Sequence, residues 1–178
     1  MINTRIVMTV AAAASLLILP ARISRTATGG SPQAAELPAT LKGSTMSVAK
    51  GTFTVKTTPQ PVPEGDDSGI ARLLLDKQFH GDLEGTSKGQ MLASGGPGTG
   101  SGGYVAIEKV TGSLAGRKGG FALQHLGTMQ GGGNFQLAIN VVPDSGTGEL
   151  TGLSGKFSID IKDGQHFYTF EYSLPAAQ

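Results

Sequence analysis

Glu108 and His125 are the residues whose types and positions indicate chemistry most directly, because each interrupts an alternation of apolar side chains. His125 shares a predicted strand face with Phe121 and Leu123, where an imidazole must find a hydrogen-bond partner or face a cavity. Glu108 points into the protein if its neighbour Lys109 points to water. A buried carboxylate has a raised pKa unless it is paired, and general bases and ligand anchors arise in this way. The alternative is an exposed Glu108 beside an exposed Lys109 near a strand end.

Tyr104 and Gln124 complete the set of candidate ligand-binding residues. Tyr104 shares the strand face of Glu108, and Gln124 directly precedes His125. We predict that these four residues contact a small, largely apolar molecule, and the sequence leaves any catalytic residue unassigned. An isomerase or cyclase that uses Glu108 as base or electrostatic anchor, with His125 as its partner, is the first alternative. A structural module with a filled core and no pocket is the second.

Three further patterns associated with catalysis lack the context that their chemistry needs. Residues 98–103 match G-x-G-x-x-G, but a strand pattern follows instead of the helix whose N-terminus would bind phosphate. Residues 85–89 match the nucleophile-elbow pattern G-x-S-x-G, yet they too continue into an extended run. The three histidines, His80, His125 and His166, show no metal-ligand spacing, and the chain has no cysteine. We therefore predict no metal site, no cofactor and no disulfide.

Alternation of apolar and polar residues at period two recurs from residue 46 onward, and no stretch shows helical periodicity over three turns. The clearest alternating runs lie at residues 52–56, 104–110, 121–129, 135–141, 157–161 and 168–174. Each run has about the length of one strand and ends in turn-forming residues. Seven or eight strands without a covering helix must close on themselves or stack as two sheets. We favour closure, because edge strands so rich in glycine would pair with other chains.

A short repeat, G-x-L-x-G, occurs at residues 81–85, 112–116 and 148–152. Its three copies are too unevenly spaced for a solenoid. A leucine flanked by glycines between two strands is typical of a hairpin corner whose apolar side chain plugs the end of a barrel. The sequence therefore predicts an all-β fold that consists of a single antiparallel barrel.

The first 28 residues have the order of a secretory signal peptide, since Arg5 precedes an apolar run at residues 6–19. A helix of that length reaches about 21 Å, short of the roughly 30 Å hydrocarbon core of a bilayer. We therefore expect a signal peptide (1–28), no stable membrane insertion after processing, a flexible spacer (29–45) and a barrel domain (46–175). The protein is then periplasmic or secreted. If translation starts at Met46 instead, it is cytoplasmic.

The charge balance argues against nucleic acid as a partner. The formal net charge is +1, but three of the 14 basic residues lie in the first 28 positions. The remaining 11 basic and 13 acidic residues leave −2, and no basic run is interleaved with aromatic residues. The few aromatic residues, with no tryptophan, do not supply the girdles of a transmembrane barrel. A homo-oligomer is compatible with the sequence.

Two longer stretches carry a resemblance to known proteins: GYVAIEKVTGSLAGRKGGFALQHLGT at residues 103–128 and VVPDSGTGELTGLSG at residues 141–155. Both closely resemble a bacterial family of uncharacterised domains whose fold is similar to the allene oxide cyclase barrel. The resemblance implies an eight-stranded barrel and no established activity. No catalytic motif of the cyclases matches here, so a cyclase activity would rest on analogy of fold alone. The leader is a departure, because the usual family member begins near the position of Met46.

Overall fold

The computed structural model describes residues 46–96 and 98–175, and the regular structure in these ranges is all β-strand. The strands are β1 (Met46–Pro59), β2 (Ala71–Gly81), β3 (Leu83–Gly95), β4 (Gly102–Leu114), β5 (Arg117–Gln130), β6 (Asn134–Val141), β7 (Thr147–Gly148), β8 (Ser154–Lys162) and β9 (Gln165–Ser173). The predicted signal peptide (1–28) and spacer (29–45) lie outside the described residues and stay predictions. Within the described ranges, no helix is long and apolar enough to cross a bilayer.

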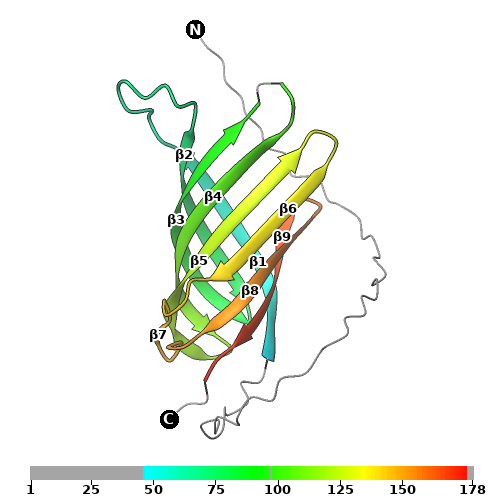
Figure 1. The fold of residues 1–178 in the computed structure, drawn as a ribbon. Helices are drawn as coiled ribbons and strands as arrows, with labels where there is room; N and C mark the ends of the chain where they lie inside the picture. Colours follow the sequence, from blue (N-terminus) through cyan, green and yellow to red (C-terminus); the bar gives the residue numbers. More distant parts are fainter. Residues whose placement is uncertain (1–45, 97, 176–178) are drawn as a thin grey trace, which may run out of the picture.

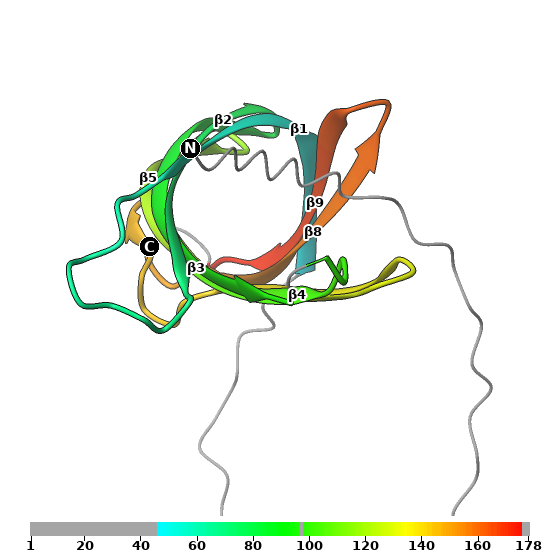
Figure 2. The same ribbon diagram turned by 90° about the horizontal axis from the view of Figure 1, so that it is seen from above.

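Eight strands form one closed antiparallel barrel, as Figure 1 shows from the side and Figure 2 from above. Strands β1 to β6 pair in sequence order, β6 pairs with β8, β8 pairs with β9, and β9 pairs with β1 to close the ring. The short β7 adds a two-residue pairing to β5. Closure gives the facing edges of β1 and β9 partners that an open sheet would lack. The predicted all-β, eight-stranded antiparallel barrel is confirmed.

Alternation along each strand decides which side chains face the interior. In β4, Ala106, Glu108 and Val110 are buried, whereas Val105 and Ile107 are exposed on the outer face. The inner face is the one that carries Glu108. The direction of this carboxylate, which the sequence pattern left open, is therefore inward.

We call the end of the barrel that holds the β2–β3 and β4–β5 turns the closed end. The three copies of G-x-L-x-G place their leucines there, and Leu83, Leu114 and Leu150 are all fully buried. Gly116 has a φ of 84° in the tight β4–β5 turn, a left-handed conformation that favours glycine. The predicted role of these leucines as plugs of the barrel end is confirmed.

An aromatic layer lies next to the plugs and fills the interior. Its buried members are Phe79, Phe121, Phe157, Tyr168 and Phe170. The rings of Phe121 and Phe170 stack at 5.7 Å, and those of Phe157 and Tyr168 stack at 5.1 Å. The Tyr168 hydroxyl also accepts a hydrogen bond of 2.8 Å from the backbone N–H of Leu83, which ties this layer to a corner.

The opposite end of the barrel, which we call the open end, holds the β1–β2, β3–β4, β5–β6 and β8–β9 turns. Most of its inward-facing side chains are apolar, as at the closed end, but they remain half-buried. They include Val55, Leu73, Met91, Leu137 and Ile159. Along its length, the barrel changes from a filled core to a partly exposed apolar lining.

Candidate functional site

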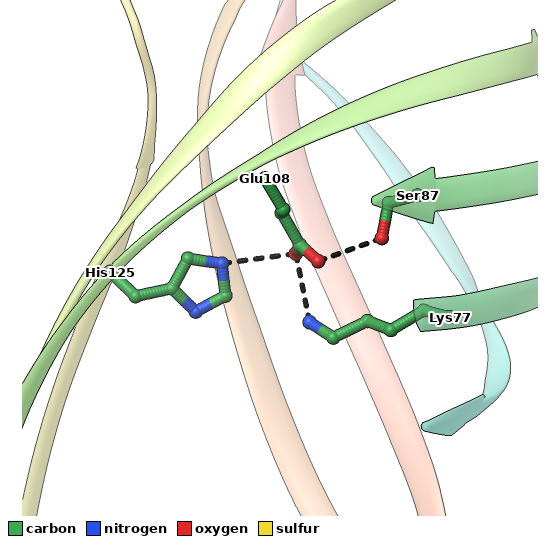
Figure 3. A network of polar contacts seen from close by, with 4 residues as sticks. All are labelled: Lys77, Ser87, Glu108 and His125. Atoms are coloured by element: carbon green, nitrogen blue, oxygen red, sulfur yellow. Dashed lines mark hydrogen bonds and ion pairs between the residues drawn. The ribbon is translucent and has the colours of Figure 1, made fainter. Parts of the chain in front are cut away.

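Four polar side chains meet inside the barrel, between its two ends (Figure 3). Lys77, Ser87, Glu108 and His125 come from the neighbouring strands β2, β3, β4 and β5. Their exposed fractions are 5%, 1%, 1% and 4%. We call these four residues the polar cluster. Buried polar groups in such numbers need mutual partners, so their geometry decides what they can do.

Strand register brings the polar cluster together. Lys77 and Ser87 face each other across the β2–β3 pair, and Glu108 faces Gly89 across the β3–β4 pair. A Cβ at Gly89 would lie 2.6 Å from the Cβ of Glu108, so glycine at this position leaves the space that the glutamate occupies. The site therefore depends on the register between consecutive strands.

The carboxylate of Glu108 is the centre of the polar cluster (Figure 3). Lys77 Nζ donates to Oε1 at 2.8 Å, and His125 Nε2 lies 3.0 Å from the same oxygen. Ser87 Oγ donates to Oε2 at 2.7 Å. Three donors on two oxygens give this carboxylate the partners that a buried charge requires.

Glu108 is held in its ionised form. Burial by itself would raise its pKa, but the hydrogen bond from His125 and the charge of Lys77 outweigh burial and lower the pKa to about 2. Because an ionised carboxylate only accepts, Nε2 of His125 carries the proton of their hydrogen bond. A carboxylate with so low a pKa is a weak base near neutral pH. The geometry thus favours Glu108 as the residue that positions Lys77 and His125.

Lys77 and His125 keep hydrogen-bonding capacity that the described residues do not use. The ammonium of Lys77 has three donors, of which one goes to Glu108. Its Nζ also lies 5.0 Å from the ring centroid of Phe53, in cation–π range. Nδ1 of His125 has no hydrogen bond within residues 46–96 and 98–175. In these ranges, every fully buried side-chain nitrogen has a hydrogen-bond partner. Because Nδ1 has none, it is not fully buried and reaches accessible space.

Tyr104 lies on the open-end side of the polar cluster, on the same face of β4 as Glu108. A Cβ at Gly127 would lie 2.2 Å from its ring Cε1, so glycine at this facing position makes room for the ring. Burial raises the pKa of Tyr104 to about 12, and the charge of Glu108 contributes as well. The hydroxyl is therefore a donor at neutral pH, and no hydrogen bond to another described residue perturbs it.

Of the four residues predicted to bind a ligand, Tyr104, Glu108 and His125 lie together and Gln124 lies apart. Gln124 is exposed on the outer face of β5, whereas His125 is buried inside. Consecutive residues of a strand point to opposite faces, so adjacency in sequence to His125 excludes Gln124 from the same interior. The candidate site therefore contains Tyr104 and the polar cluster, without Gln124.

Lys77 and Ser87 are site residues that the sequence patterns did not single out. The signal for Lys77 is its place in the alternation of β2, where it shares the inner face with Leu75 and Phe79. A lysine on an apolar face needs an anionic partner. That partner, Glu108, is 31 residues further along the chain, and only the register of the intervening strands identifies it.

Within the described residues, the other two histidines make no hydrogen bond to the polar cluster. His80 is exposed and pairs with Glu84, with 3.4 Å between Nδ1 and Oε2. His166 is half-buried against Phe53, with ring centroids 4.9 Å apart, and burial lowers its pKa with a smaller contribution from Lys77. Both line a groove of about 440 Å³ between β1 and the β8–β9 turn. Among the described residues, no three His, Asp or Glu side chains are arranged to hold a metal ion.

Comparisons with known proteins place this barrel in a family. The profile of a family described as "Protein of unknown function (DUF3224)" matches residues 49–172, more than half of the chain. A crystal structure of a DUF3224 protein of unknown function from Shewanella oneidensis MR-1 is 47% identical, with a TM-score of 0.68. The match covers 75% of this chain and 100% of the Shewanella chain. A search of curated proteins gives no significant match. The resemblance to a bacterial family of uncharacterised domains is thereby confirmed, and the chain belongs to the DUF3224 family.

Proposed function

We propose that this protein binds a small, largely apolar molecule that carries one neutral polar group. The observation that supports this most strongly is the set of unused hydrogen-bonding groups on Lys77, His125 and Tyr104. Lys77 and His125 lie beside Glu108, whose Oε1 accepts two hydrogen bonds and whose Oε2 accepts one, and Tyr104 lies on the open-end side of Glu108 along β4. One partner satisfies a buried polar group, and Glu108 supplies it to Lys77 and to His125, so their remaining hydrogen-bonding capacity is not needed for the fold. Groups left over at the accessible side of such a cluster are suited to a ligand.

The apolar part of the ligand would lie toward the open end of the barrel. The inward-facing residues there, among them Met91, Leu137 and Ile159, are apolar and half-buried. Sites for small molecules combine mostly apolar walls with a few polar groups that fix orientation. Eight-stranded barrels have an interior wide enough for one such ligand.

The polar group of the ligand is expected to be a hydroxyl or a carbonyl. Lys77 and Glu108 already balance each other at 2.8 Å. An anion placed beside Lys77 would also lie close to the carboxylate of Glu108, and repulsion between like charges is strong in a weakly solvated interior. A neutral oxygen can accept a hydrogen bond from Lys77 without that cost.

An isomerase or cyclase that acts on the same class of molecule is the second candidate. The hydrogen bond of 3.0 Å between Glu108 and His125 favours it, because a carboxylate that orients an imidazole is a common acid–base arrangement. In this scheme, His125 transfers the proton and Glu108 positions it, which reverses the base role expected for Glu108 from the sequence. Turnover of a bound molecule that His125→Gln abolishes, while binding persists, would support this candidate.

Native mass spectrometry of protein purified gently from its own host tests the binding proposal. We expect an additional mass that organic extraction removes. The double variant Lys77→Met/Glu108→Gln removes both charges of the buried pair and should lose this mass, whereas the outer-face control Gln124→Ala should retain it. Retention by the double variant would contradict the proposed site. A clean mass for every protein would favour a structural module with a filled core.

Further expectations from the sequence stay proposals. Export rests on residues 1–28, and N-terminal sequencing of the protein from fractionated host cells tests it; a protein that begins at Met46 would contradict export. The allene oxide cyclase-like type of barrel rests on the sequence resemblance.

Self-association could use Leu92, Val105 and Leu126, which are neighbours in register on the outer face and are 46%, 50% and 55% exposed. Light scattering of the wild type and of Val105→Lys tests whether the protein self-associates through these residues.

A further inference from the structure

The ring of eight strands has one weak junction, between β6 and β8. Its ladder consists of the single pair Asn140 and Lys156. Each of the other seven junctions contains at least eight register pairs. Strand length does not explain the difference, because β6 has 8 residues and β8 has 9. Figure 2 shows the ends of the β5–β6 and β8–β9 hairpins pointing apart, so the two strands diverge toward the open end.

We call the two unpaired strand edges, residues 134–139 of β6 and 157–162 of β8, the seam. Four inward-facing side chains line it on the open-end side of the last paired residues. They are Phe135, Leu137, Ile159 and Ile161, and all four are apolar and half-buried. The seam is therefore a partly exposed apolar strip in the side of the barrel.

The seam begins at the level of the polar cluster. His125 faces Ile139 across the β5–β6 pair, and Leu137, the next inward residue of β6, faces Gly127. Gly127 is the residue that makes room for the ring of Tyr104. A molecule held by His125 and Tyr104 would therefore lie directly beside the seam.

The outer side of the β8 edge is unsuited to a strand from another chain. Lys156, Asp160 and Lys162 are exposed there, and Lys162 pairs with Asp160 at 2.9 Å. Charged side chains on an edge strand oppose pairing with a further strand. A flexible alkyl chain has no such requirement, because it can lie along the apolar inner side chains while the backbone groups of the edges stay hydrated from outside.

We infer that the seam is the subsite and the entrance for a linear alkyl chain, so that the ligand is a neutral single-chain amphiphile such as a medium-chain alcohol or aldehyde. This inference rests on the proposed function, because the polar cluster and Tyr104 bind the head of the same molecule. Each methylene that reaches the seam adds apolar contact with β6 and β8, and affinity rises by about fourfold for each methylene removed from water. Affinity should therefore increase with chain length.

A disulfide across the seam provides the test. Because the chain has no native cysteine, two introduced cysteines can pair only with each other within one molecule. Ala138 and Ser158 would face each other if the register of Asn140 and Lys156 continued by two residues, and both are exposed on the outer face. Oxidation of Ala138→Cys/Ser158→Cys closes the seam without altering its lining. Thr128→Cys/Gln136→Cys is the matched control, because these exposed residues face each other in the intact β5–β6 ladder.

Isothermal titration calorimetry with hexanol and decanol is the measurement. We expect the wild type and the oxidised control to bind decanol far more tightly than hexanol. The oxidised seam variant should keep its hexanol affinity and lose at least about tenfold in decanol affinity, which reduction restores. If the disulfide does not form, Ile161→Gln tests the role of the seam, because it makes the seam polar without closing it. This variant should weaken the binding of decanol and leave the binding of hexanol unchanged.

The outcomes separate this inference from the proposal on which it rests. Wild-type affinity for decanol in both the oxidised seam variant and Ile161→Gln would overturn the role of the seam and leave the binding site standing. Failure of both alcohols to bind the wild type would overturn the binding site and the seam together. Unchanged binding of both alcohols by Lys77→Met/Glu108→Gln would overturn the polar cluster as the site of the head group.

Discussion

The two ends of this barrel are built from the same alternating strands and pack in opposite ways. At the closed end, Leu83, Leu114 and the aromatic layer fill the interior and leave no exposed surface on the plugs. At the open end, Leu137 and Ile159 face the same interior and stay half-buried. Both linings are apolar, so the difference lies in how each end is bounded. Corner leucines fill the closed end, whereas two strands diverge at the open end.

The polar cluster lies at the boundary between these two regions. The filled core lies on one side of its buried ion pair, and the partly exposed lining lies on the other side. The contrast separates a region that stabilises the barrel from the region in which the proposed ligand would bind. Substitutions at the closed end should change stability, and substitutions at the open end should change affinity.

The largest effect is expected at the boundary itself. Lys77→Met leaves the buried carboxylate of Glu108 without its cation, and removal of one partner of a buried pair costs about 3–5 kcal/mol of unfolding free energy. Urea unfolding followed by circular dichroism measures the loss. Lys77→Met/Glu108→Gln removes both charges and should recover most of it. A single variant within about 1 kcal/mol of the wild type would show that the pair does not contribute to stability.

A matched pair of leucine truncations sharpens the comparison of the two ends. Leu114→Ala opens a cavity in the filled closed end and should cost about 2–5 kcal/mol of unfolding free energy. Leu137→Ala removes a half-buried side chain at the open end and should cost about 1 kcal/mol. The same urea experiment compares them. Equal losses would mean that the open end is packed as firmly as the closed end.

Acid should weaken the protein through Glu108. Its pKa falls from an ordinary value of 4.5 to about 2 on folding, so the unfolded chain takes up this proton first. The stabilisation is complete above the unfolded pKa and is lost as pH falls toward the folded pKa. Between pH 6 and pH 3, the wild type should lose about 2 kcal/mol more than Lys77→Met/Glu108→Gln. Parallel stability curves for the two proteins would contradict an ionised Glu108 in the folded state.

The smallest effect on stability is expected at Tyr104. Tyr104→Phe removes a hydroxyl that no described residue uses, so its unfolding free energy should stay within about 0.5 kcal/mol of the wild type. Decanol affinity, measured by calorimetry, should fall by about 2- to 10-fold, because a hydrogen bond to the ligand is lost. Gln124→Ala is the control and should change neither quantity. Unchanged affinity in Tyr104→Phe would remove this residue from the site.

The closed end could be predicted from the sequence because its signals are local. A leucine between two glycines at a corner is visible within five residues, and the structure places Leu83, Leu114 and Leu150 where the repeat predicts. Alternation within one strand likewise places His125 on the face of Phe121. Local alternation fixes the face of a residue relative to its own strand.

The polar cluster could be predicted only in part, because it depends on register between strands. Nothing within residues 71–81 states how far that strand is shifted along its neighbours, so the meeting of Lys77 with Glu108 is invisible in the sequence. Both faces of residues 104–110 carry apolar side chains, which left the direction of Glu108 open. The seam is harder still, since the lengths of β6 and β8 would allow full pairing.

The closure of the ring by β1 and β9 has a consequence for folding kinetics. Met46 pairs with Ser173 and Phe53 pairs with His166, so the first and last strands of the described chain are neighbours. The other junctions join strands that are close in sequence, whereas this one must bring together the two most distant strands. Loop-closure entropy makes such pairing slow, so we expect it to follow the local hairpins. Until β9 has been synthesised and has docked, the edge of β1 remains open to strands of other chains.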